Sequence, residues 1–238
     1  MRPITPKQIE SLATAQQYFH DCYILSSLGI LSRSKKGQKI LQNNITTNGK
    51  DFNIKFLNVN GKTEDYFISS KEIHDLKFRN SDDTLQEMHC PIIKSVELAV
   101  NKLIKNHPFK KPPIYRAMDT QQPFEYNKPS RFLELFTGQK PITLNESSLR
   151  MSLMSKLRDA GDLIMKIWED EDSAFMLGTG VHFGKLPSWH CFDITKVDMP
   201  NNSFTVFDHR QNEELKFPIL SGLIKFKFLT GFLGKDLK

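Results

Sequence analysis

Three residues in this chain of 238 amino acids have types and settings that suit nucleophilic chemistry at a carbonyl group. Cys22 lies at the start of an apolar stretch with helical spacing, where the positive end of a helix favours the thiolate form of a cysteine. His190 lies in a stretch that alternates between apolar and polar residues, and Asp208 ends the next apolar strand. Adjacent antiparallel strands would place His190 beside Asp208, which predicts an imidazole base oriented by an acid.

Each of the three also fits a structural role. A cysteine in an apolar helix is commonly a small core residue, and the other two fit a surface histidine and an aspartate in a turn. Two further histidines are alternatives for the base: His182, in a glycine-rich stretch, and His20, which we expect at the surface near the site. Asp193 is a weaker alternative for the orienting acid, because its side chain should leave the strand on the face opposite His190.

The pattern of apolar residues predicts the elements that would hold these side chains. Residues 21–31 should form a buried helix with Cys22 in its first turn, and residues 91–106 a second helix with one apolar stripe. The Asn60-Gly61 dipeptide between two alternating stretches predicts a β-hairpin. A capping-box pattern at Thr143 to Glu146 should begin a further helix. Strands are expected in AFMLGTGV, WHCFDITKVD, SFTVFDHR and LIKFKFLTG.

These elements predict an α+β fold. A mainly helical N-terminal part, residues 1–172, would carry the nucleophile, and an antiparallel β-rich C-terminal part, residues 173–238, would carry the histidine and the aspartate. Together the two parts would form one catalytic domain. The apolar content of 39% is enough for a sizeable core and excludes a disordered chain.

Composition also narrows the possible partners. The chain carries 33 Lys and Arg against 27 Asp and Glu, but the basic residues are scattered, so nucleic-acid binding is not expected. No apolar run is long enough for a membrane span, and the first residues do not resemble a secretion signal. The three cysteines, Cys22, Cys90 and Cys191, form no CxxC pair, which favours a reducing compartment over disulfides or a zinc site. Cys191 should face away from His190, into the core.

Several segments together resemble the calpain-type cysteine peptidases of the papain-like superfamily. The most specific is QQYFHDCYILSSLGIL, in which Gln16 stands six residues before Cys22 in an Asp-Cys-aromatic-aliphatic-Leu-Ser context. IIKSVELAVNKL is similar to the Glu-x-Ala helix of that family, PSRFLELFTG to its Leu-Thr-Gly segment, and WHCFDITKV to its His-Ala-Tyr-Ser-Val strand. The matches follow the family's order and cover roughly residues 15–210.

The resemblance implies a papain-like two-lobe fold, with a helical N-terminal lobe and a β-rich C-terminal lobe. It also implies that Cys22 is the nucleophile, His190 the general base and acid, and Asp208 the third member of a triad. Gln16 would donate to the oxyanion from its side chain, beside the backbone N–H of Cys22. Asp208 stands where the family has Asn followed by Pro-Trp, and His20 where it often has Gly, so the chain would be a divergent member. Calcium ligands cannot be traced, and no metal or cofactor is expected.

The expected function is that of a cysteine peptidase that cleaves peptide or isopeptide bonds of protein substrates. The same triad would serve a deubiquitinase, a deamidase or an acyltransferase, and an inactive binding module of the same fold is a further alternative. Analogy suggests action in the cytoplasm, or in a host cell as a delivered bacterial effector without a cleaved signal peptide.

Overall fold

The computed structural model describes residues 1–15, 22–57, 61–76, 78–79, 85–86, 90–106, 129–144, 153–170, 172–179, 186–187, 190–223, 226 and 228–236. The first elements, which we call the helical part, are β1 (Arg2–Pro3), α1 (Pro6–Ala13), α2 (Cys22–Arg33), α3 (Lys35–Asn44), β2 (Ile45–Thr47), β3 (Phe52–Leu57), β4 (Thr63–Ile68), α4 (Ser70–Asp75), β5 (Phe78–Arg79), β6 (Leu85–Gln86), α5 (Pro91–Asn106) and α6 (Pro129–Thr137).

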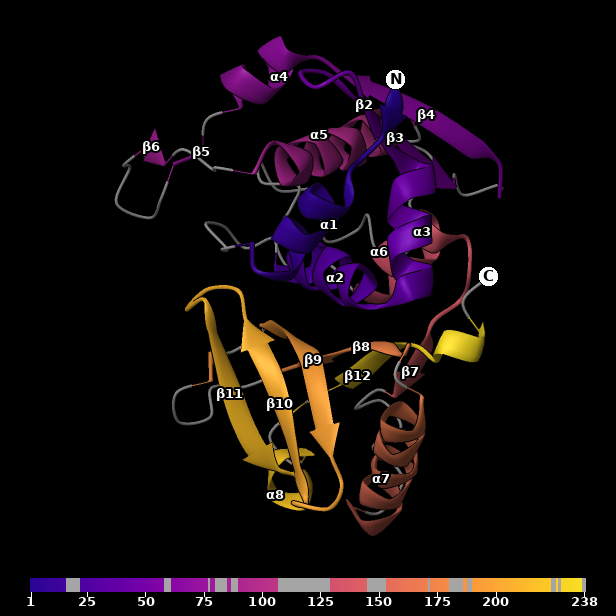
Figure 1. Cartoon of the computed structure of the whole chain (residues 1–238), viewed down its shortest axis with the longest axis vertical. Coiled ribbons are helices and arrows are strands. Elements are labelled where there is room, and N and C mark those ends of the chain that lie inside the picture. Colours follow the sequence, from indigo (N-terminus) through magenta and orange to yellow (C-terminus); the bar gives the residue numbers. More distant parts are fainter. Residues whose placement is uncertain are drawn as a thin grey trace.

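The remaining elements, which we call the β-rich part, follow α6 along the chain. They are β7 (Ile142–Leu144), α7 (Leu153–Glu169), β8 (Ala174–Gly178), β9 (Cys191–Asp198), β10 (Ser203–Asp208), β11 (Glu213–Pro218), α8 (Ile219–Leu223), β12 (Phe228–Phe232) and the 3-10 helix η3 (Gly234–Asp236). Figure 1 shows the helical part stacked on the β-rich part, with α2 at the boundary above β9 and β10.

Antiparallel sheets dominate both parts. Within the described residues, the β-rich part has a six-stranded sheet in the order β11-β10-β9-β8-β12-β7, and the helical part has a four-stranded sheet in the order β1-β2-β3-β4. Every pair in both sheets is antiparallel. The expected mixture of helices with antiparallel sheets, an α+β fold, is therefore confirmed.

Among the described residues the interior divides into two hydrophobic clusters, and β8 contributes side chains to both of them. Ala174 and Met176 join the cluster of the helical part, whereas Phe175 and Leu177 join the cluster of the β-rich part. This alternation follows from the two-residue period of a strand, and it explains why β8 is apolar without interruption. β7 extends the six-stranded sheet and α7 packs into the second cluster, so both elements are described with the β-rich part.

The helix α2 is the element that joins the two parts. Its residues from Cys22 to Ser32 are all buried, as expected for a helix that is surrounded by protein on every side. Two of its serines are satisfied within the helix, because Ser27 donates to the carbonyl of Tyr23 and Ser32 to that of Gly29. One side of α2 packs against β8 and β9 of the β-rich part.

Most of the predicted elements are present. The helix at residues 91–106 is α5, and β3 and β4 form the predicted hairpin, with Gly61 at a φ of +74°. The helix predicted to follow Thr143 is present as α7, but its predicted start is wrong, because Thr143 lies in β7 and its hydroxyl bonds that of Thr230 in β12 at 2.8 Å. Pairing with β12 therefore overrides the local capping pattern; the described part of the following helix begins at Leu153.

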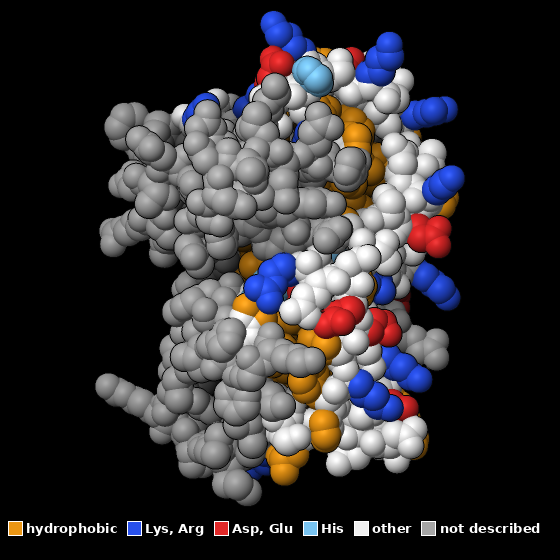
Figure 2. Space-filling view, turned by 90° about the vertical axis from the view of Figure 1, so that its left-hand side faces the viewer, with side chains coloured by type: hydrophobic (Ala, Val, Ile, Leu, Met, Phe, Trp, Pro, Cys, Tyr) orange, Lys and Arg blue, Asp and Glu red, His pale blue; other side chains and the backbone are white. Residues whose placement is uncertain are grey.

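The surface of the described residues carries scattered charges. On the face shown in Figure 2, Lys and Arg side chains stand apart from one another, with Asp and Glu side chains among them. Among the described residues, no helix has the length and apolar character needed to cross a membrane.

Candidate active site

Cys22 is the first residue of α2, as the sequence predicted. Cys22 is 8% exposed and belongs to the cluster of the helical part. The N–H groups of the first helical turn lack partners within the helix, so their partial positive charge favours an anion at this position. The thiol hydrogen-bonds both His190, which directly precedes β9, and Cys191, the first residue of that strand.

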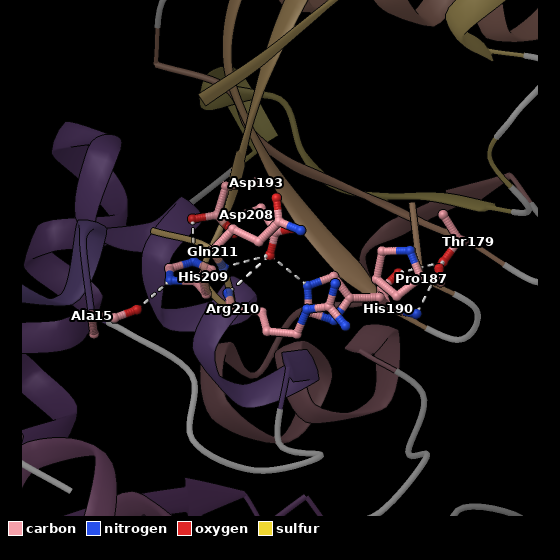
Figure 3. Close-up of polar contacts among 9 residues, drawn as sticks. All are labelled: Ala15, Thr179, Pro187, His190, Asp193, Asp208, His209, Arg210 and Gln211. Atoms are coloured by element: carbon pink, nitrogen blue, oxygen red, sulfur yellow. Dashed lines mark hydrogen bonds and ion pairs between the residues drawn. The ribbon is translucent and has the colours of Figure 1, made fainter. Parts of the chain in front are cut away.

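His190 is held at the edge of β9 by contacts with the end of β8. Its backbone N–H donates to the hydroxyl of Thr179 at 3.0 Å, and its carbonyl accepts from the N–H of Thr179 at 2.9 Å. The Thr179 hydroxyl in turn donates to the carbonyl of Pro187 at 2.5 Å (Figure 3). The imidazole packs edge-on against Phe192, with the ring centroids 4.7 Å apart. Backbone and ring are thus both fixed.

Asp208 is the partner of His190, in agreement with the predicted pairing of neighbouring strands. Its Oδ1 lies 2.9 Å from Nε2 of His190, and both side chains are almost fully buried (Figure 3). The same oxygen accepts from the N–H groups of Arg210 at 2.8 Å and Gln211 at 3.4 Å. Its Oδ2 has no hydrogen-bond partner among the described residues. Because Nε2 faces Asp208, the other ring nitrogen, Nδ1, is left for Cys22.

The ionisation of these groups follows from their contacts. Burial would lower the pKa of His190, but hydrogen bonds to Asp208 and Cys22, with the negative charges of both, raise it to about 9. Burial would raise the pKa of Asp208, but the hydrogen bond and charge of His190 and the N–H groups of Arg210 and Gln211 hold it below its usual value. The arrangement therefore favours an imidazolium between two anions at neutral pH.

Cys191 is a second thiol in this site. The pKa of Cys22 lies well below its ordinary value, and the largest cause is the hydrogen bond from Cys191. Burial acts in the opposite direction, whereas the hydrogen bond and the charge of His190 lower the pKa of Cys22 further. The hydrogen bond between the two thiols, with burial and the charges of Cys22 and Asp193, raises the pKa of Cys191. Cys191 therefore stays protonated, and its S–H donates a hydrogen bond to the sulfur of Cys22. It is buried as predicted, but it faces the nucleophile candidate.

The other candidate residues are placed as follows. Gln16, His20 and His182 lie outside the described residues. Asp193 does not contact His190; its Oδ2 lies 3.0 Å from Nε2 of His209, on the opposite face of the strands. The structure therefore brings together Cys22, His190 and Asp208, and it leaves the position of Gln16 untested.

Reasoning from the sequence missed three residues of this region: Thr179, Cys191 as a neighbour of Cys22, and His209. Thr179 follows an apolar strand and has no distinctive motif. His209 directly follows Asp208, so alternation along a strand could have placed it on the opposite face, toward Asp193. Its partners, however, depend on how the strands pair.

Comparisons with known proteins give no independent family assignment. No protein-family model matches this chain, and no curated protein matches it either.

Proposed function

We propose that this chain is a calpain-type cysteine peptidase of the papain-like superfamily, which cleaves peptide or isopeptide bonds of protein substrates. The observation that carries the proposal is the line of contacts from Cys22 through His190 to Asp208, with the thiol at the start of a buried helix. The stacking of the helical part on the β-rich part is compatible with the two-lobe arrangement that this family would have (Figure 1).

The proposed reaction begins from the thiolate of Cys22 and the imidazolium of His190. The thiolate attacks the substrate carbonyl carbon, the C–S bond forms, and the carbonyl electron pair moves onto oxygen. The side chain of Gln16 and the N–H of Cys22 would stabilise that oxyanion. The C–N bond then breaks as His190 gives its proton to the leaving amine. Water attacks the thioester, His190 takes the proton of that water, and Cys22 leaves as thiolate.

The roles of the partners follow from their positions. Asp208 holds the ring of His190 with Nδ1 toward Cys22 and stabilises its positive charge. Cys191 stabilises the thiolate by its hydrogen bond. The three cysteines, all among the described residues, form no disulfide, which supports action in a reducing compartment, the cytoplasm or a host cell to which the protein is delivered.

A peptide vinyl-sulfone probe tests the proposal, since it reacts with a thiolate that is presented to a bound peptide. We expect labelling at Cys22 in the folded protein at neutral pH, and none after His190→Ala. Cys90 serves as the internal control, because burial raises the pKa of its thiol. Labelling of Cys90 in preference to Cys22 would contradict the proposal. A profiling screen with peptide libraries and ubiquitin chains then assigns the substrate. Repeating the screen with different acyl acceptors distinguishes hydrolysis from acyl transfer.

A further inference from the structure

A second His–Asp pair lies on the other face of the strands that carry the first. His209 Nε2 lies 3.0 Å from Asp193 Oδ2, and both side chains are 0% exposed (Figure 3). The proposed reaction does not use this pair. A buried ionic pair needs a reason, because it seldom stabilises a fold more than apolar residues of the same volume would.

Both ring nitrogens of His209 face hydrogen-bond acceptors. Nε2 meets the carboxylate of Asp193, and Nδ1 meets the backbone carbonyl of Ala15 at 2.6 Å. A neutral imidazole can donate from one nitrogen only, so with Asp193 as a carboxylate the two bonds together require the imidazolium. Burial would lower the pKa of His209, but the charge of Asp193 and the bonds to Asp193 and Ala15 raise it. His209 is therefore a fixed cation.

Arg33, in the last turn of α2, is the second cation beside Asp193. Its Nε lies 3.7 Å from Asp193 Oδ2, and its guanidinium carbon lies 5.4 Å from the centre of the Phe207 ring. The guanidinium donates to the backbone carbonyl of Ala13 at 2.6 Å. Two cations that share one carboxylate thus hold the carbonyls of Ala13 and Ala15.

Gly29 in α2 leaves room for the carboxylate of Asp193 and the ring of His209. A Cβ at Gly29 would lie 2.0 Å from Asp193 Oδ2 and 3.0 Å from His209 Nε2. A larger residue would push the carboxylate away from α2. Gly29 and Arg33 are one helical turn apart, and Cys22 lies two turns before Gly29, so one side of α2 carries all three toward β9.

We propose that His209, Asp193 and Arg33 form a positioning set that fixes the backbone at Ala13 and Ala15, ahead of Cys22 in the chain. Ala13 ends α1 and Ala15 directly precedes Gln16 in the sequence, so the set holds the backbone just before the proposed oxyanion donor and the nucleophile. The inference rests on the proposed function for its effect on turnover. The set would act through position alone, because none of its three side chains contacts the reacting atoms in the proposed mechanism.

Two variants and one matched control test the proposal in the full chain. His209→Gln keeps one donor and removes the second, and Arg33→Met keeps the packing over Phe207 and removes the bond to Ala13. Asp172→Asn is the control: Asp172 joins the two parts elsewhere, by accepting from the backbone N–H groups of Lys35 and Lys36 at the start of α3. The readouts are amide hydrogen exchange by peptide, turnover of a peptide substrate, and the rate at which iodoacetamide alkylates Cys22.

Both variants should accelerate exchange about fivefold or more in the peptide that runs from α1 to Cys22. Turnover should fall about 10²-fold, as for a misplaced reacting group, whereas alkylation of Cys22 should keep its rate and pH dependence. The control should accelerate exchange at the start of α3 only. Alkylation needs no oxyanion donor, so a site that simply loosens would lose alkylation and turnover together.

Three results would overturn the inference. They are unchanged exchange before Cys22 in both variants, faster exchange with the turnover of the parent protein, and parallel loss of alkylation and turnover. If the parent protein shows neither turnover nor a reactive Cys22, the proposed function fails. The exchange measurement still decides whether these three side chains hold the backbone.

Discussion

The two His–Asp pairs lie on the same two strands and differ in what the second ring nitrogen meets. His190 contacts Asp208 on one side and the Cys22 thiol on the other, whereas His209 contacts Asp193 on one side and the carbonyl of Ala15 on the other. A thiol can exchange a proton with imidazole, but a backbone carbonyl cannot. The first pair can therefore move a proton during a reaction, and the second can only hold the chain.

An imidazole with a carboxylate partner is not in itself a base. Both histidines are buried, and the pKa of each is raised above its ordinary value by its carboxylate partner against the effect of burial. The neighbour on the second nitrogen decides the role. Substitutions in the two pairs should therefore differ in kind as well as in size.

The largest expected effect is that of His190→Ala. Without the imidazole, Cys22 loses its base and its positively charged neighbour, so turnover should fall about 10⁴-fold or more. The pH at which Cys22 becomes alkylated should rise, because the hydrogen bond and charge that lower its pKa are gone. His209→Gln should cost far less turnover and leave that pH unchanged. Equal losses in the two variants, with equal shifts in the alkylation profile, would refute the distinction between the pairs.

Asp208→Ala should have the next largest effect. Loss of the carboxylate lets the imidazole turn and lowers the pKa of His190 from about 9, so turnover should fall about 10²-fold or more and its alkaline limit should move to lower pH. Loss of the bonds to Arg210 and Gln211 should also cost stability, on the order of 1 kcal/mol for each bond.

Asp208→Asn is the matched variant. It can still orient the ring but lacks the charge, so its turnover and its alkaline limit should lie between those of the parent protein and Asp208→Ala. Rate–pH profiles of the three proteins make the comparison. An Asp208→Ala profile that matches the parent would mean that Asp208 only closes the turn after β10.

The smallest expected effect is that of Cys191. Cys191→Ala removes the hydrogen bond that contributes most to the low pKa of Cys22, so Cys22 should need a higher pH for alkylation, and turnover should fall more at pH 6 than at pH 8. Cys191→Ser retains a donor and should change the profile less. Cys90→Ala should leave it unchanged. A profile in Cys191→Ala equal to that of the parent would show that His190 alone sustains the thiolate.

Much of the fold could be predicted from the sequence because strong local patterns agree with the final packing. The apolar stripe of α5 and the hairpin at Gly61 are examples. The apolar run at residues 21–31 likewise predicted that Cys22 lies at the start of a buried helix, which is α2. Thr143 shows the opposite case. Its capping pattern was local, but pairing with β12 placed it in a strand, and such long-range pairing cannot be read from four residues.

The pairing of β9 with β10 explains why the site was only partly predictable. The register shifts between Thr205 and Val206: Thr205 pairs with Lys196, but Val206 pairs with Ile194, so Thr195 is an extra residue in β9. The shift brings the end of β10 one residue closer to His190 than an unbroken ladder would. Alternation predicted that the side chain of Asp193 leaves the strand on the face opposite His190. The face of Asp208 depends on the bulge, because an unbroken ladder would place Asp208 opposite Asp193, and the partners of His209 likewise depend on the folded sheet.

The central claim is that Cys22 and His190 rest as a thiolate and an imidazolium. The most direct test is the rate of iodoacetamide alkylation of Cys22 between pH 5 and 10, with Cys90 followed in the same samples. We predict that Cys22 reacts at a pH well below that needed by an ordinary thiol, and that its rate changes again near pH 9 as His190 loses its proton. Cys90 should react only at higher pH. A Cys22 rate that instead rises as for an ordinary thiol, with a midpoint at about 8.5 or above, would contradict the claim.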